Sequence, residues 1–186
     1  MSFPRRFSPF LVLGMGNPLL SDDGIGLKVV DCAQRTINLP DVLTVFKKNY
    51  CGGIDLLYDM AGYERAIIVD SVVTGTAALG HCHEFSLDSV GGASQDRLVY
   101  AHGIDIATVF RIGRQCGYDM PGETVIFGIE SCDTTTFSEQ VTPALEASLE
   151  KIIEKIEQKL SAWAERLESA CGASLGCRGK PEPACA

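Results

Sequence analysis

The sequence predicts a single α/β domain with a twisted, mostly parallel five-stranded sheet and helices on both faces. Short, nearly continuous apolar runs alternate with helical segments, which is typical of parallel strands buried on both sides. The chain has 186 residues, about the length of one domain. Hydrophobic residues make up 46% and charged residues 22%, a balance that excludes disordered and fibrous proteins.

The first predicted strand, residues 10–13, is an apolar run that ends at Gly14-Met-Gly16-Asn17-Pro18. This pattern indicates a buried strand entering a tight turn. A helix is expected next, because apolar residues recur at helical spacing over 25–33, and Ser21, Asp22 or Asp23 is suited to its N-cap.

The middle of the chain continues the alternation of strand and helix. Apolar runs predict strands at 42–46, 65–70, 81–85 and 124–129, and helices are expected at 54–60 and 104–115. The last helix is the clearest, since apolar residues recur three or four positions apart from Leu145 to Leu167. Thr142-Pro143 fits its N-cap and first turn.

We therefore expect a domain at residues 10–169, preceded by an extension at 1–9 and followed by a flexible tail at 170–186. The tail carries three of the eight cysteines. Because the cysteines are scattered without a disulfide framework, reduced thiols and a cytoplasmic location are expected. Arg5-Arg6 precedes an apolar run, but no small-residue cleavage site follows, so we do not interpret it as an export signal.

The charge balance restricts the partners. Lys and Arg total 16 and Asp and Glu total 24, giving a net charge of −8. An acidic chain without a basic cluster is unsuited to phosphate backbones or anionic lipid, so neither nucleic acid nor a membrane is expected as a partner. No apolar run approaches the roughly 18 to 20 residues that cross a bilayer.

Three residues are candidates for chemistry: Asp23, Asp70 and His102. Asp70 ends a strongly apolar strand, where an unpaired carboxylate is costly, and ligands of open α/β sheets bind at the carboxyl ends of strands. Each of the three follows a predicted strand or opens a helix on that edge. Together they are suited to a divalent cation with open positions for water and substrate. Taken singly, Asp22 and Asp23 are also explained as acids at a helix start, and His102 as a solvated or capping residue.

Other sites are less well supported. Gly14-Met-Gly16 begins a dinucleotide fingerprint, but Leu19 replaces the third glycine and Phe46-Lys47-Lys48 stands where an acidic residue is needed. His81 and His83 share one strand face but form an incomplete metal site. Cys51 is a conceivable nucleophile with His102 as its base, although nothing indicates a lowered thiol pKa. The tail cysteines, Cys171, Cys177 and Cys185, match no zinc motif.

The segment Leu11–Gly26, LVLGMGNPLLSDDGIG, resembles the N-terminal signature of the hydrogenase maturation proteases, which trim the large subunit of nickel–iron hydrogenases. The resemblance continues through Cys51-Gly52-Gly53, the strand ending at Asp70, the His102 segment and Val125–Glu130. It therefore spans about residues 10 to 165 in the family's order.

The resemblance implies an aspartic-type endopeptidase that removes a short C-terminal peptide from the nickel-loaded large-subunit precursor. The precursor itself brings the nickel, and the family's nickel-sensing residues correspond to Asp23, Asp70 and His102. We expect metal-assisted hydrolysis with Asp22 as the proton acceptor, and a monomeric enzyme.

Asn17, Gly52 and Gly53 are candidate substrate contacts, because a side-chain amide and a glycine turn can hold an extended peptide. Turn formation explains these three residues equally well. Two other functions remain open: a nickel-sensing chaperone or checkpoint that binds the precursor without cutting it, and a nucleotide-binding α/β oxidoreductase.

Overall fold

The computed structural model describes residues 9–39, 43–50, 52–87 and 106–175. Five strands form one sheet in the order β2-β1-β3-β5-β4. The strands are β1 (Phe10–Met15), β2 (Thr44–Asn49), β3 (Arg65–Val72), β4 (Cys82–Ser86) and β5 (Glu123–Glu130). The first three and β5 are parallel, whereas β4 pairs antiparallel with β5 at the edge. The predicted fold class, a mostly parallel five-stranded sheet, is confirmed.

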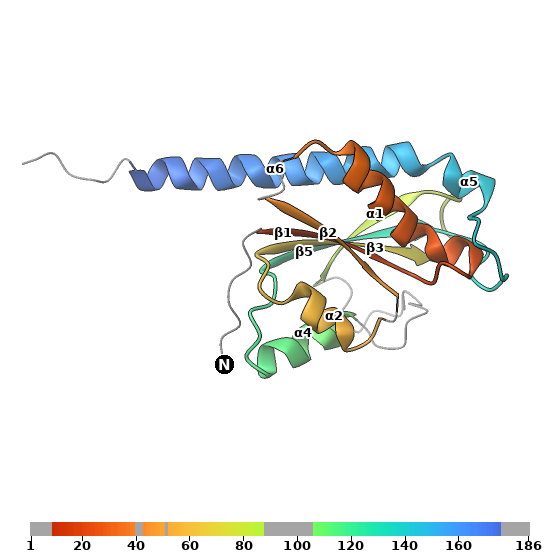
Figure 1. Ribbon diagram of the computed structural model, residues 1–186, viewed down its shortest axis with the longest axis horizontal. Helices are drawn as coiled ribbons and strands as arrows, with labels where there is room; N and C mark the ends of the chain where they lie inside the picture. The colour runs from red at the N-terminus through yellow and green to blue at the C-terminus, as the bar shows by residue number, and fades with distance from the viewer. Residues whose placement is uncertain (1–8, 40–42, 51, 88–105, 176–186) are drawn as a thin grey trace, which may run out of the picture.

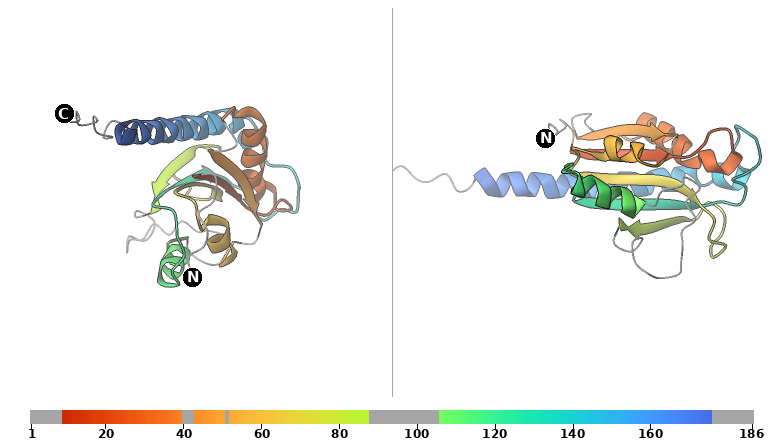
Figure 2. Two further views of the ribbon diagram at one scale, coloured as in Figure 1. Left: turned by 60° about the vertical axis from the view of Figure 1, so that its left-hand side comes forward. Right: turned by 90° about the horizontal axis from the view of Figure 1, so that it is seen from below.

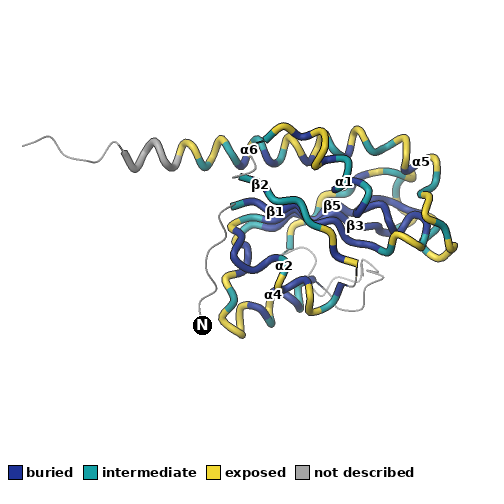
Figure 3. Tube along the Cα trace, viewed as in Figure 1, coloured by how far each residue is buried: buried dark blue, intermediate teal, exposed yellow. Residues whose placement is uncertain are grey.

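Helices cover both faces of this sheet (Figures 1 and 2). On one face lie α1 (Ile25–Thr36) and α6 (Leu149–Leu175), which pack their apolar stripes against Phe10, Ile67 and Phe127. On the other face lie α2 (Asp55–Met60) and α4 (Ile106–Gln115), over Leu11, Ile68 and Ile126. The central strands are therefore buried from both sides (Figure 3), which explains their continuous apolar runs.

The C-terminal helix differs from its prediction in two ways. It is divided into α5 (Pro143–Glu146) and α6, with Ala147 and Ser148 between them. It also continues to Leu175, past the expected start of the flexible tail at residue 170. Residues 1–8 of the predicted extension at 1–9, and the residues from 176 onward, lie outside the described part of the chain. None of the described helices has the length and apolar character needed to cross a membrane.

Candidate active site

The carboxyl ends of β1 and β3 lie side by side, because Gly14 pairs with Val69. The start of α1 packs directly on these strand ends at Gly26. A Cβ atom there would lie 2.3 Å from the carbonyl oxygens of both Met15 and Val69. At Gly16, with φ of 141°, a Cβ atom would lie 1.9 Å from the Asp23 carbonyl oxygen. These glycines therefore allow the turn before α1 to lie against the sheet edge.

Two of the three predicted metal ligands, Asp23 and Asp70, are brought together there. Asp23 lies in the 3-10 turn η1 (Ser21–Gly24), and Asp70 lies near the end of β3. Ser71 joins them: its hydroxyl donates to Asp23 Oδ1 at 3.0 Å, and its backbone N–H donates to Asp70 Oδ1 at 2.8 Å. Both carboxylates are almost completely buried.

Burial, with a smaller contribution from the nearby Asp23 carboxylate and against the lowering effect of the Ser71 N–H, raises the pKa of Asp70 to about 8. Two adjacent buried carboxylates are costly to keep ionised unless a cation balances them. Their oxygen donors suit a divalent metal with open coordination positions. The chemistry of this donor pair therefore fits the expected contact with a metal ion.

His102, the third predicted ligand, lies outside the described residues, as does Cys51. Within the described ranges, no group of three His, Cys, Asp or Glu side chains is placed to hold a metal ion. The metal-ligand set of Asp23, Asp70 and His102 therefore remains a prediction.

Asp22 has different surroundings from Asp23. Its carboxylate accepts hydrogen bonds from the backbone N–H groups of Thr142 at 2.7 Å, Asp133 at 3.1 Å and Cys132 at 3.2 Å. Burial alone raises the pKa of Asp22, but these three hydrogen bonds together outweigh burial and lower the pKa. A carboxylate with a lowered pKa and this many donors is a poor base. These contacts give Asp22 a structural role in holding the loop, and its proton-accepting role stays a prediction.

Asn17, Gly52 and Gly53 take part in turns at the same edge of the sheet. The Asn17 backbone N–H donates to Asp23 Oδ2 at 2.9 Å, and its side-chain oxygen accepts from Leu19 N–H at 3.0 Å. Gly52 and Gly53 have φ of 61° and 65°, and Gly52 N–H donates to the Asn49 side chain at 2.6 Å. A Cβ atom at Gly53 would meet nothing within 4 Å. Turn formation is thus observed, and the substrate contacts remain predictions.

Another buried carboxylate, that of Glu130, lies at the end of β5. It accepts hydrogen bonds from the backbone N–H groups of Thr74 at 2.9 Å and Gly75 at 2.8 Å, and His83 Nε2 lies 2.9 Å from its Oε2. The rings of His81 and His83 are 4.7 Å apart. The two histidines thus share one region, as the sequence predicts, and Glu130 orients His83.

Sequence reasoning missed the contributions of Ser71 and Glu130. Glu130, like Asp70, is an acidic residue near the end of an apolar strand, so the same sequence pattern could have identified it as a candidate site residue. Ser71 carries no such signal, because its hydroxyl bonds to a residue 48 positions away.

The fold and site define an α/β enzyme with paired buried carboxylates at the carboxyl edge of a parallel sheet. The chain is 29% identical over 148 residues to the Hydrogenase 2 maturation protease of Escherichia coli K12. The alignment covers 78% of this chain and 87% of that protein. No family model matches the sequence.

Solved structures agree with this relationship. The hydrogenase maturating endopeptidase HybD from E. coli superposes with a TM-score of 0.68 and 26% identity, covering 82% of this chain and 92% of that one. An endopeptidase from E. coli solved in solution gives a TM-score of 0.65 and 27% identity, covering 79% and 88%. The chain is thus similar over about four fifths of its length to hydrogenase maturation proteases, and it is an enzyme of the endopeptidase class.

Proposed function

We propose that this protein removes a short C-terminal peptide from the nickel-loaded large-subunit precursor of a nickel–iron hydrogenase. The relatives named for this activity support the reaction class. The observation that carries the proposal for this chain is the pair of buried carboxylates, Asp23 and Asp70, joined by Ser71. A site with two adjacent buried carboxyl groups at a sheet edge is suited to a substrate that brings its own cation, because the cation favours the ionised form of both.

In this proposal the nickel belongs to the precursor, and when bound it supplies Lewis acidity at the scissile carbonyl or at a water. Asp23 and Asp70, with His102 as the proposed third ligand, orient the precursor by contacting its metal. Since Ser71 and the Asn17 N–H hold Asp23 in one orientation, no reorganisation of that carboxylate is needed when substrate binds. The proposal includes a monomeric, cytoplasmic enzyme.

The test is incubation of the purified protein with nickel-loaded and nickel-free precursor, read as the mass change at the precursor's C-terminus. Cleavage of the nickel-loaded form alone supports the proposal. Binding of the precursor without any mass change would contradict it and would favour a checkpoint role.

Substitutions identify the site within the same assay. Asp23→Ala, Asp70→Ala and His102→Ala are each expected to abolish processing while circular dichroism stays unchanged. The matched control is Asp31→Ala, because Asp31 lies on the exposed side of α1 and pairs with Lys48 at the surface. Full processing by any one of the three site variants would remove that residue from the site.

A further inference from the structure

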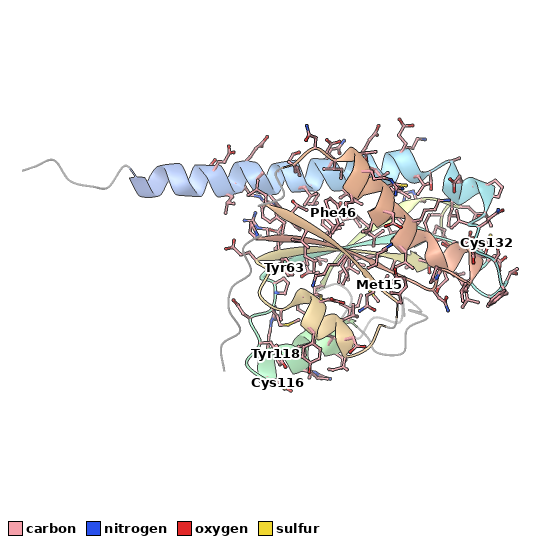
Figure 4. The ribbon with its side chains drawn as sticks, viewed as in Figure 1. Met15, Phe46, Tyr63, Cys116, Tyr118 and Cys132 are labelled. Atoms are coloured by element: carbon pink, nitrogen blue, oxygen red, sulfur yellow. The ribbon has the colours of Figure 1, made fainter. Side chains whose placement is uncertain are left out.

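The loop that connects β5 to α5, residues 132–142, is tied to the candidate active site at both of its ends. Asp22 Oδ2 accepts from the N–H groups of Cys132 and Asp133 at the start of the loop, and Asp22 Oδ1 accepts from Thr142 N–H at its end. The Asp22 N–H donates in turn to the Asp133 carbonyl at 2.9 Å. One buried residue of η1 thus closes the whole loop. Cys132 marks its start in Figure 4.

The middle of the loop is also held. Ser138 N–H donates to the Leu19 carbonyl at 2.9 Å, and Ser21 N–H donates to the Ser138 carbonyl at 2.8 Å. These bonds form a parallel bridge between Leu20 and Ser138. Asp133 Oδ1 accepts from Thr136 N–H at 3.0 Å within the loop. The turn that carries Asp23 and the loop that carries Phe137 therefore form one hydrogen-bonded unit.

This unit presents two large apolar side chains to solvent. Phe137 is 79% exposed and Leu19 is 41% exposed. Exposed apolar side chains on an ordered surface unit mark a candidate contact with another polypeptide. Ser138 N–H is hydrogen-bonded to the Leu19 carbonyl, so Phe137 lies one residue from that contact. Asp23 follows Leu19 by four positions in the same turn.

We propose that Phe137 and Leu19 form a docking surface for an apolar segment of the large-subunit precursor, next to the bond that is cut. This inference rests on the proposed function. Phe137 and Leu19 lie on the same hydrogen-bonded unit as Asp23, so a polypeptide whose metal contacts Asp23 can extend over this unit. A stable contact between two copies of a chain buries about 800 Å² on each partner, which is more area than two side chains offer. A short peptide segment that is already anchored at the neighbouring site can bind with a much smaller buried area.

The experiment compares Phe137→Ala with the control Tyr58→Ala in steady-state cleavage of nickel-loaded precursor. Tyr58 is a suitable control because it is 54% exposed and packs on Tyr118, at the end of the molecule away from Cys132 (Figure 4). Both side chains are mostly exposed, so neither substitution threatens the fold. Binding is measured in parallel by biolayer interferometry on immobilised precursor. Every variant, including the reference, carries Asp70→Asn to prevent turnover, so the loss of the Asp70 metal contact is common to all of them.

We expect Phe137→Ala to raise KM and Kd by roughly 10- to 30-fold, with kcat within about twofold of the wild type. Phe137→Leu should recover part of the loss, since it keeps an apolar contact. Tyr58→Ala should match the wild type. If Phe137→Ala also matches the wild type while the wild type cleaves, the docking surface is wrong and the proposed function stands.

Two further outcomes separate this inference from the proposed function. If the precursor binds but is not cut, the proposed function fails, and the Kd of Phe137→Ala still decides the docking surface. Light scattering detects self-association: a wild-type dimer that Phe137→Ala dissociates would assign the patch to a second copy of this chain and overturn the inference.

Discussion

The Ser71 hydroxyl donates a hydrogen bond to Asp23 Oδ1 at 3.0 Å, joining the end of β3 to the turn after β1. The same residue's N–H donates to Asp70 Oδ1 at 2.8 Å. Ser71 therefore sets the orientation of two carboxylates from different parts of the chain. It is a positioning residue for the proposed site.

Replacing Ser71 with Ala should lower kcat/KM for nickel-loaded precursor roughly tenfold, because Asp23 loses a donor and gains freedom to rotate. Steady-state cleavage assays check this prediction. Ser131→Ala is the matched control, since Ser131 is also buried but its hydroxyl donates to the Ile129 carbonyl. Equal activity of the two variants would show that the hydrogen bond to Asp23 does not matter for processing.

Asp22→Asn should reduce the free energy of unfolding by about 2 to 4 kcal/mol. The amide cannot accept the three backbone hydrogen bonds that the carboxylate accepts without placing its NH₂ group against a donor. Urea unfolding measures the loss, and the exposed Asp31→Asn should change stability by less than about 0.5 kcal/mol. An Asp22→Asn protein with unchanged stability and a large loss of kcat would restore Asp22 as a proton acceptor.

Much of the fold was predictable, because the burial of β1, β3 and β5 on both faces requires apolar runs that are visible in the sequence. Asp70 was found for the same physical reason: a carboxylate near the end of such a run stands out. The proximity of His81 and His83 was predicted from the two-residue period of a strand, although His81 lies one residue before β4.

The details that depend on contacts distant in sequence were not predictable. Asp22 and Asp23 are neighbours with identical side chains, yet one binds the 132–142 loop and the other binds Ser71. Which acid takes which role is set by the backbone of η1, where Ser21 has a φ of 48°. The interruption of the last helix at Ala147 and Ser148 is likewise invisible in its apolar spacing.

Glu130→Gln should destabilise the protein most at neutral pH. Burial raises the pKa of Glu130, but the hydrogen bonds from Thr74, Gly75 and His83 together outweigh burial and lower it below 4.5. A carboxyl whose pKa is lowered by folding stabilises the protein above its unfolded pKa and loses that effect as the pH falls through the folded value.

The difference in melting temperature between the wild type and Glu130→Gln should therefore be large at pH 7 and should shrink below about pH 4.5. Thermal unfolding followed by circular dichroism at several pH values measures it. Glu84→Gln is the control, because Glu84 is exposed and pairs with Lys159 at the surface. A difference that stays constant with pH would mean that Glu130 acts through packing rather than charge.

Asp70→Asn should make the metal-free protein more stable and inactive. Folding raises the pKa of Asp70 from 3.8 to about 8, so the folded state holds this proton more tightly than the unfolded state does. A carboxyl with a raised pKa contributes full stability below its unfolded pKa, and the contribution falls as the pH rises from about 4 to 8. Above that window the buried charge carries its whole cost. The amide has no charge to bury and still accepts from Ser71 N–H through its oxygen.

Urea unfolding in the presence of a chelator should show equal stability of the two proteins near pH 4. Near pH 8 the Asn variant should gain on the order of 5 kcal/mol. Processing of nickel-loaded precursor should be lost at every pH, because the amide is a weaker metal ligand than a carboxylate. If the stabilities of the wild type and variant run parallel from pH 4 to pH 8, Asp70 is ionised throughout and its charge is already balanced within the protein. A rising difference would show that the protein keeps a destabilising acid at this position because the site requires it.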